Sequence, residues 1–242
     1  RGLIATGDAL RAKRNEVSKT IGRLKGTQPD LITEMRQVGD QIAALERDLG
    51  QVQGQLDCIL RILPNYPEEE VPDGSGESDN RVVREWSGNQ GSNSDAIPHW
   101  EIGEDLGIID FERGVKLSGS RFHVLMGQGA TLERALISFM MDIHTREHGY
   151  TETQVPTIVR RDVMVGSGNL PKFSDNLYHD SEDDLWLIPT AEVPLTNLHR
   201  DEVLQSKILP LNYVASTPCF RREKAAAGRD TRGIKRVHQF SK

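Results

Sequence analysis

The feature that most restricts the fold is a long apolar repeat in the first quarter of the chain. Its spacing alternates between four and three residues without a break, through Leu31, Met35, Val38, Ile42, Leu45, Leu49, Val52, Leu56, Ile59 and Leu63. This heptad seam predicts one long helix that packs along a second helix. The predicted rod is about 50 Å long, too long for the core of a small globular domain.

The partner helix is predicted immediately before it. Leu10, Val17, Ile21 and Leu24 follow the same kind of seam, and Gly26 to Asp30 reads as a tight turn with Asp30 as the helix N-cap. Residues 1–63 are therefore expected to form an antiparallel helical hairpin. The first helix is shorter than the second, so we expect residues before Arg1 to complete it.

The first helix is strongly basic. Asp8 and Glu16 are its only acids, against a basic set that includes Arg11, Lys13, Arg14, Lys19, Arg23 and Lys25. Three interpretations stay open from charge and periodicity: a solvated helix face, a generic coiled-coil interaction module, or an arm that binds a nucleic-acid backbone.

A linker and connecting segment, residues 64–112, separates the hairpin from a second domain. Pro64 stops the helix, and the stretch to Asn80 is rich in Gly, Ser and acidic residues. We predict a short strand at 81–86, a loop at 88–95 and an amphipathic segment at 100–108.

The second domain, residues 113–242, is predicted to mix strands and helices. We expect a strand at 122–126, a helix from Ala130 to His148 ended by Gly149, and a strand at 151–155. The main apolar stripe of the helix is expected to face the core, and Ile137 and Met141 are left to face a twofold partner. That stripe comprises Leu132, Ala135, Leu136, Phe139, Met140 and Ile143.

The last stretch of the chain, residues 217–242, is predicted to be two short strands joined by a basic loop. Eight Lys and Arg residues stand against two acids between Arg221 and Lys242. If 220–223 is a strand, Arg221 and Glu223 share a face, because side chains alternate along a strand. A guanidinium can fork onto phosphate oxygens and a carboxylate can accept from an amino group. A solvated basic hairpin is the competing interpretation.

A second candidate site is Thr190-Ala191-Glu192, which follows the apolar run 185–188 and Pro189. A hydroxyl and a carboxylate at a strand end can bind a small polar ligand. Taken alone, these residues are better explained by a plain surface turn.

The order of residues in 217–242 resembles a known motif. The strings F-R-x-E, G-R-D-T-R-G and R-V-H-Q-F are similar to motif 2 of class II aminoacyl-tRNA synthetases, in the form found in the seryl-tRNA synthetase family. The resemblance implies that Arg221 holds the ATP α-phosphate and the amino-acid carboxylate. It also implies that Glu223 reads the adenine amino group, Arg236 reaches the γ-phosphate and Phe240 stacks on adenine.

The likeness extends over nearly the whole chain. T-A-E at 190–192 resembles the family's serine-binding segment, and 130–156 resembles motif 1, its dimer-forming element. The strings at 166–168, 172–173 and 176–178 also stand where the family has similar ones. The basic hairpin resembles the arm that grips the long variable arm of serine tRNA. This implies an α+β fold: a helical arm plus part of an antiparallel-sheet catalytic domain.

The implied activity is serine–tRNA ligation, with ATP, L-serine and tRNA(Ser) as substrates, Mg²⁺ as cofactor and a homodimer as the assembly. Motif 3 and the serine-contacting glutamate of the family do not occur within the 242 residues, so we expect a fragment that is inactive alone. Whether selenocysteine tRNA is charged stays open. The alternative is a synthetase-like paralogue that activates a small amino acid for a carrier protein, or one that only binds RNA.

Composition fits a cytoplasmic protein. Cys58 and Cys219 are too few and too far apart for a disulfide framework, and both are predicted to be packing residues. No apolar run approaches the roughly 20 residues that span a bilayer, so no membrane partner is expected. Because the net charge is −6, any nucleic-acid contact must come from local basic patches.

Overall fold

The computed structural model describes residues 1–23, 29–86, 96–224 and 231–242. The chain divides into two compact units, Arg1–Pro67 and Glu68–Lys242. Residues 99–112, which the sequence assigned to a connecting segment, belong to the second unit. None of the described helices is both long and apolar enough to cross a bilayer.

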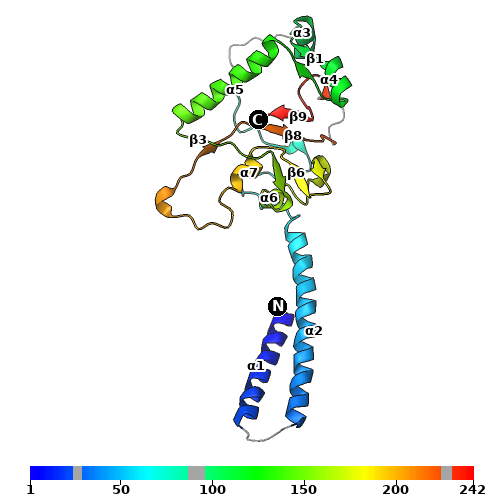
Figure 1. Ribbon diagram of the computed structural model, residues 1–242, viewed down its shortest axis with the longest axis vertical. Coiled ribbons are helices and arrows are strands. Elements are labelled where there is room, and N and C mark those ends of the chain that lie inside the picture. Colours follow the sequence, from blue (N-terminus) through cyan, green and yellow to red (C-terminus); the bar gives the residue numbers. More distant parts are fainter. Residues whose placement is uncertain (24–28, 87–95, 225–230) are drawn as a thin grey trace. The chain divides into compact units, whose positions relative to one another are not determined.

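The first unit is a helical hairpin, as predicted. Helix α1 (Gly2–Arg23) and helix α2 (Pro29–Leu60) run side by side in opposite directions (Figure 1). Val38 and Ile42 of the seam are buried, with 4% and 5% of their surface exposed. Two ion pairs join the helices, Arg11 to Glu46 at 2.8 Å and Lys13 to Glu34 at 2.7 Å.

The seam is covered only along its first half. From Val52 onward its members are exposed, because α1 packs against the N-terminal part of α2. Asp30 is not the N-cap: α2 already begins at Pro29, and proline suits the first helical position, where no N–H is needed. Cys58 is exposed on α2, so its assignment as a packing residue was wrong. Residues 24–28 lie outside the described residues. They include Lys25 and the first three positions of the predicted turn.

The second unit begins with extended chain. A single 3₁₀ turn, Glu77–Asp79, precedes residues 81–86, which form no strand. Val82, Val83 and Trp86 are all exposed. The predicted strand was wrong because its apolar residues pack against no neighbouring strand in the described part of the chain. The predicted loop at 88–95 lies outside the described residues.

Two short helices and two short strands then precede the long helix of this unit. Helix α3 (His99–Asp105) is followed by strand β1 (Ile109–Asp110), helix α4 (Phe111–Ser118) and strand β2 (Val124–Leu125). The two strands pair antiparallel. Asp110 caps α4 by accepting from the Arg113 backbone N–H at 2.7 Å, and this bond lowers the pKa of the Asp110 carboxyl.

Helix α5 (Gln128–Arg146) forms where the sequence predicted a helix, and Gly149 follows it with φ +70°. The predicted orientation of its faces was wrong. Ile137 and Met141, expected to face outward, are half-buried, whereas most of the expected core stripe is exposed. The exposed members are Leu132, Ala135, Leu136, Phe139 and Met140. Two apolar faces occur on this helix, and periodicity alone does not say which one the rest of the unit covers.

The core lies around a three-stranded antiparallel sheet. Its strand order is β4 (Ile158–Arg160), β6 (Leu185–Leu187) and β5 (His179–Asp180). A separate parallel pair joins β3 (Thr151–Glu152) to β7 (Tyr213–Val214). Short helical segments fill the connections: α6 (Arg161–Gly166), η2 (Ser174–Asn176), α7 (Glu192–Thr196) and η3 (Ser206–Ile208). The packed cluster is Val159, Met164, Leu170, Leu177, Trp186, Ile188 and Val193.

Candidate functional site

Two short antiparallel strands, β8 (Pro218–Phe220) and β9 (Gln239–Ser241), form the centre of the site (Figure 1). Thr217 and Lys242 exchange both backbone hydrogen bonds at one end, at 2.9 and 3.0 Å. Phe220 N–H donates to Ile188 O at 2.8 Å, so the strand pair is bonded to the chain that leaves β6. Cys219 is fully buried there, as predicted for a packing residue.

The predicted strand at 220–223 ends early. Strand β8 stops at Phe220, and Glu223 adopts φ +47°, a left-handed conformation that a strand does not contain. The alternation argument for Arg221 and Glu223 therefore does not apply. Their positions are set by contacts with other parts of the unit.

Arg221 connects the strand pair to the Thr190 segment. Its Nε donates to Pro189 O at 3.2 Å, and its Cζ lies 5.0 Å from the centre of the Phe240 ring. The guanidinium thus covers one face of the ring. The chain after Pro189 and the tip of β9 are held beside the same cation.

Glu223 and Arg236 lie next to each other across the loop. Arg236 Nη1 is 3.4 Å from Glu223 Oε2, and the Glu223 side chain is 12% exposed against 49% for Arg236. An acceptor for an amino group and a half-exposed cation are therefore adjacent. Residues 225–230, between these two positions in the sequence, lie outside the described residues.

The Thr190 segment holds an ammonium group. Lys242 Nζ donates to Thr190 Oγ1 at 2.9 Å and to Glu192 Oε1 at 3.1 Å. Ala191 between them is buried, at the start of α7. A hydroxyl and a carboxylate already oriented around one ammonium can accept from the α-ammonium of an amino acid in the same way.

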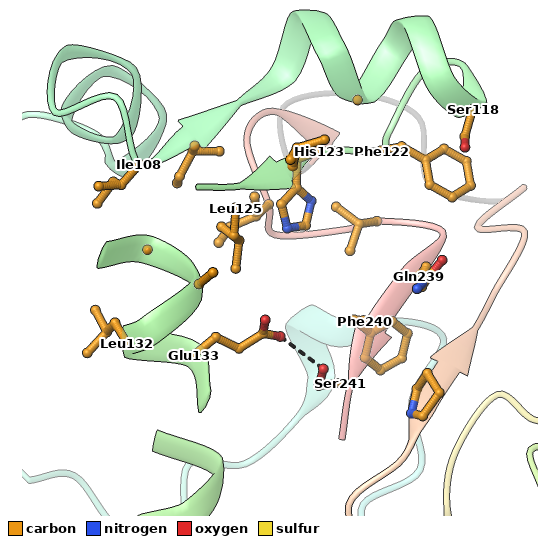
Figure 2. A pocket seen from close by; sticks show the side chains of 18 of the residues that line it. Ile108, Ser118, Phe122, His123, Leu125, Leu132, Glu133, Gln239, Phe240 and Ser241 are labelled. Atoms are coloured by element: carbon orange, nitrogen blue, oxygen red, sulfur yellow. Dashed lines mark hydrogen bonds between the residues drawn. The ribbon is translucent and has the colours of Figure 1, made fainter. Parts of the chain in front are cut away.

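A groove of about 780 Å³ lies on the α5 side of β9 (Figure 2). Its lining is mainly apolar and includes Leu125 and Leu132, with Phe240 at its β9 wall. Glu133 accepts from the Ser241 hydroxyl at 2.9 Å across it. Burial lowers the pKa of His123 in the same lining, and the Glu133 carboxylate opposes that shift.

Sequence reasoning missed the contacts between helix α3 and residues 232–234 of the basic loop. Ile234 N–H donates to His99 Nε2 at 2.9 Å, and the Arg232 guanidinium lies 5.1 Å from the Trp100 ring centre. Gly233, at φ +72°, lies against the same two rings, where a side chain would collide with His99. Helix α3 therefore anchors the described end of the basic loop, and sequence spacing gave no signal because the partners are far apart.

The basic residues of the arm fall into two groups. Arg11 and Lys13 are engaged in the interhelical ion pairs. Arg14, Lys19 and Arg23 are exposed on α1 and form no ion pair with a residue that the structure describes. Among the residues predicted to bind tRNA, these three are accessible to phosphates.

Comparisons with known families match both units. Residues 1–67 match the family described as the seryl-tRNA synthetase N-terminal domain. Residues 172–242 match the tRNA synthetase class II core domain of the G, H, P, S and T enzymes. The two matched segments include the arm, the Thr190 segment and the strand pair with its loop.

Individual relatives align with the whole chain. A serine–tRNA ligase of Thermomicrobium roseum is 54% identical over 100% of this chain and 55% of its own length, and one of Roseiflexus castenholzii is 55% identical over 100% and 57%. The crystal structure of a Pyrococcus horikoshii seryl-tRNA synthetase complexed with ATP matches with a TM-score of 0.85 and 35% identity, covering 100% of this chain and 59% of the other. A cytoplasmic serine–tRNA ligase of Naegleria fowleri in complex with AMP matches with a TM-score of 0.79, at 26% identity. The chain spans just over half the length of these relatives, and along that span it carries segments that match the seryl-tRNA synthetase N-terminal domain and the class II tRNA synthetase core domain.

Proposed function

We propose that the full-length gene product carrying this sequence is a serine–tRNA ligase, which activates serine with ATP and transfers it to tRNA(Ser). One observation carries the amino-acid half of this proposal. Thr190 and Glu192 hold an ammonium group at 2.9 and 3.1 Å, beside the guanidinium of Arg221. An amino acid needs this combination, because it presents an ammonium and a carboxylate on the same α-carbon.

In the first step, a serine carboxylate oxygen attacks the α-phosphorus of ATP and pyrophosphate leaves. Arg221 orients the carboxylate and neutralises the charge that develops on the α-phosphate. In the second step, the 3′-terminal hydroxyl of tRNA attacks the carbonyl carbon of the adenylate, and AMP leaves. Catalysis here is mainly positioning and charge stabilisation, without a covalent bond to the enzyme.

The nucleotide half rests on Glu223, Arg236 and Phe240. Glu223 accepts from the adenine amino group, and Arg236, which pairs with Glu223 in this structure, releases it to reach the γ-phosphate. Adenine stacks on the face of Phe240 that Arg221 leaves open. Two of the solved relatives are complexes with ATP and AMP, which supports nucleotide binding by this protein.

Mg²⁺ is proposed to enter with the nucleotide. Within the described residues, no group of three or more His, Cys, Asp and Glu side chains could hold a metal ion. We place the ion mainly on phosphate oxygens of ATP, where Mg²⁺ commonly binds. The side chains named above bind and orient the rest of ATP.

The arm is proposed to bind tRNA through Arg14, Lys19 and Arg23, with Arg11 and Lys13 contributing mainly to the hairpin itself. Lys25 is retained as a contact from its place in the sequence. Such contacts are electrostatic, so affinity should fall steeply with salt.

The assembly is proposed to be a homodimer through α5. Large apolar side chains are exposed along this helix, and Phe139 keeps 62% of its surface exposed. A stripe of this kind on a helix fits a self-complementary twofold contact. We also place the protein in the cytoplasm, where its two free cysteines would stay reduced.

Transfer to tRNA separates this proposal from activation for a carrier protein. Radiolabelled serine, ATP and either tRNA(Ser) transcript or a phosphopantetheine-bearing carrier protein would be incubated with the full-length gene product. We expect label on the tRNA, with threonine and alanine transferred far more slowly. Label on the carrier protein alone would contradict the proposal.

A further inference from the structure

The peptide that joins Glu223 to Lys224 is bonded at both of its polar ends by distant side chains. Its carbonyl, Glu223 O, accepts from Arg121 Nη1 at 2.8 Å. Its N–H, on Lys224, donates to Asn176 Oδ1 at 3.3 Å. One peptide is thus held between two segments that lie 102 and 48 residues away in the sequence.

Arg121 and Glu223 both adopt an unusual backbone conformation. Arg121 has φ +64° and Glu223 has φ +47°, a region that residues other than glycine, asparagine and aspartate seldom occupy. Such a conformation persists only where surrounding contacts hold it, and it is often found at functional sites. The two bonds to the 223–224 peptide are contacts of this kind.

We call the two bonds from Arg121 and Asn176 to this peptide the clamp. The clamp is also bonded to the strand pair β8–β9. Arg121 O accepts from His238 N–H at 3.2 Å, and His238 Nδ1 donates to Arg221 O at 2.9 Å. On the other side, Arg222 N–H donates to Asn176 O at 2.9 Å, and Arg222 Nε donates to Leu177 O at 2.8 Å. The turn after β8 is therefore fixed along its whole length, from residue 221 to residue 224.

We propose that Arg121 and Asn176 are positioning residues for adenine selection, acting through the backbone of Glu223. By holding the left-handed turn, they direct the largely buried Glu223 carboxylate toward Arg236 and into the place where it meets the adenine amino group. They act on the identity of the base, and they leave the serine subsite at Thr190 and Glu192 unchanged. This inference rests on the proposed nucleotide site.

The test is equilibrium binding of two nucleotides to the full-length gene product, measured by titration calorimetry. ATP is compared with purine riboside triphosphate, which lacks the 6-amino group. We expect the wild type to prefer ATP by about tenfold or more, since a hydrogen bond to a charged acceptor is at stake. Arg121→Met and Asn176→Leu should each reduce that preference severalfold, and Arg121→Lys, which keeps a donor, should restore part of it.

A double-mutant cycle separates this role from general damage. In a Glu223→Ala background the preference should be lost, and adding Arg121→Met should change it no further. Arg113→Met is the matched control: it removes an arginine of α4 that pairs with Asp110 at the surface, and it should leave the preference intact. Thermal unfolding of each variant shows that the fold is retained.

The outcomes distinguish this inference from the proposed function. Undiminished preference for ATP in Arg121→Met and Asn176→Leu would overturn the clamp alone. A wild type that binds both nucleotides equally would overturn the clamp together with the adenine role of Glu223. If Arg121→Met and Asn176→Leu lose the preference for ATP but the wild type shows no serine-dependent pyrophosphate exchange, the ligase proposal is contradicted and the clamp is supported.

Discussion

The helical arm allows a matched pair of substitutions within a single helix. Ile42 and Ile59 both lie on the heptad seam of α2, but Ile42 is 5% exposed and Ile59 is 56% exposed. Replacing Ile42 by Ala removes buried carbons worth about 2–3 kcal/mol, and the better helix propensity of Ala returns a few tenths. Because a two-helix interface can partly collapse around the gap, we expect a net loss of about 2 kcal/mol.

At Ile59 the same change should have an effect within about 0.5 kcal/mol of zero, because little buried surface is lost and helix propensity improves. Hydrogen exchange of residues 1–242, followed by mass spectrometry on peptides from the arm, measures both variants. A loss of about 2 kcal/mol speeds exchange of the protected amides by roughly thirtyfold. Equal effects at the two positions would refute the view that α1 covers only the first half of the seam.

Four further outcomes follow from the site and its surroundings. Removing residues 1–63 from the full-length gene product should spare serine-dependent pyrophosphate exchange and abolish transfer to tRNA; unchanged tRNA affinity of the armless protein would contradict the role of the arm. Thr190→Val should raise the KM for serine by about two- to tenfold, with the KM for ATP unchanged, because it removes one acceptor of an ammonium; equal changes in both KM values would count against a separate serine subsite. Phe139→Asp should convert the proposed homodimer of the full-length gene product to a monomer in micromolar sedimentation runs, and a dimer as tight as the wild type would place the interface elsewhere. Burial lowers the pKa of His123 from 6.5 in the folded protein, so the unfolded chain takes up this proton at a higher pH; the stability that His123 contributes is therefore present above pH 6.5 and is lost as pH falls through the lower folded pKa. His123→Gln should remove this part of the decline in Tm between pH 8 and 5.5. A difference from the wild type that does not change with pH would contradict this prediction.

Local patterns predicted the helices well, because helix periodicity depends on residues only a few positions apart. The seam of α2 and the bounds of α5 could both be located in this way. The orientation of α5 could not, since it carries apolar residues on more than one face. Which face is covered depends on chain far from it in sequence, and the structure leaves Phe139 exposed while Ile137 is half-buried.

The order of residues in the last segment suggested the side chains of the candidate site, but spacing did not predict how they are arranged. Alternation along a strand was expected to align Arg221 with Glu223, yet the chain turns left-handed at Glu223. That turn is fixed by Arg121 and Asn176, which no local pattern links to it. The ammonium contact of Lys242 was missed for the same reason, since its acceptors lie about fifty residues earlier.

The central claim is that the strand pair β8–β9 and the segment 189–192 together bind ATP and serine for adenylate formation. The most direct measurement is ATP–pyrophosphate exchange by the full-length gene product across a panel of amino acids, for the wild type and for Arg221→Ala. We predict exchange with serine well above every other amino acid, reduced by about a hundredfold or more in Arg221→Ala, because one preorganised charge contact with the reacting phosphate is removed. Exchange that does not depend on serine, or that is equally fast without the Arg221 guanidinium, would contradict the account.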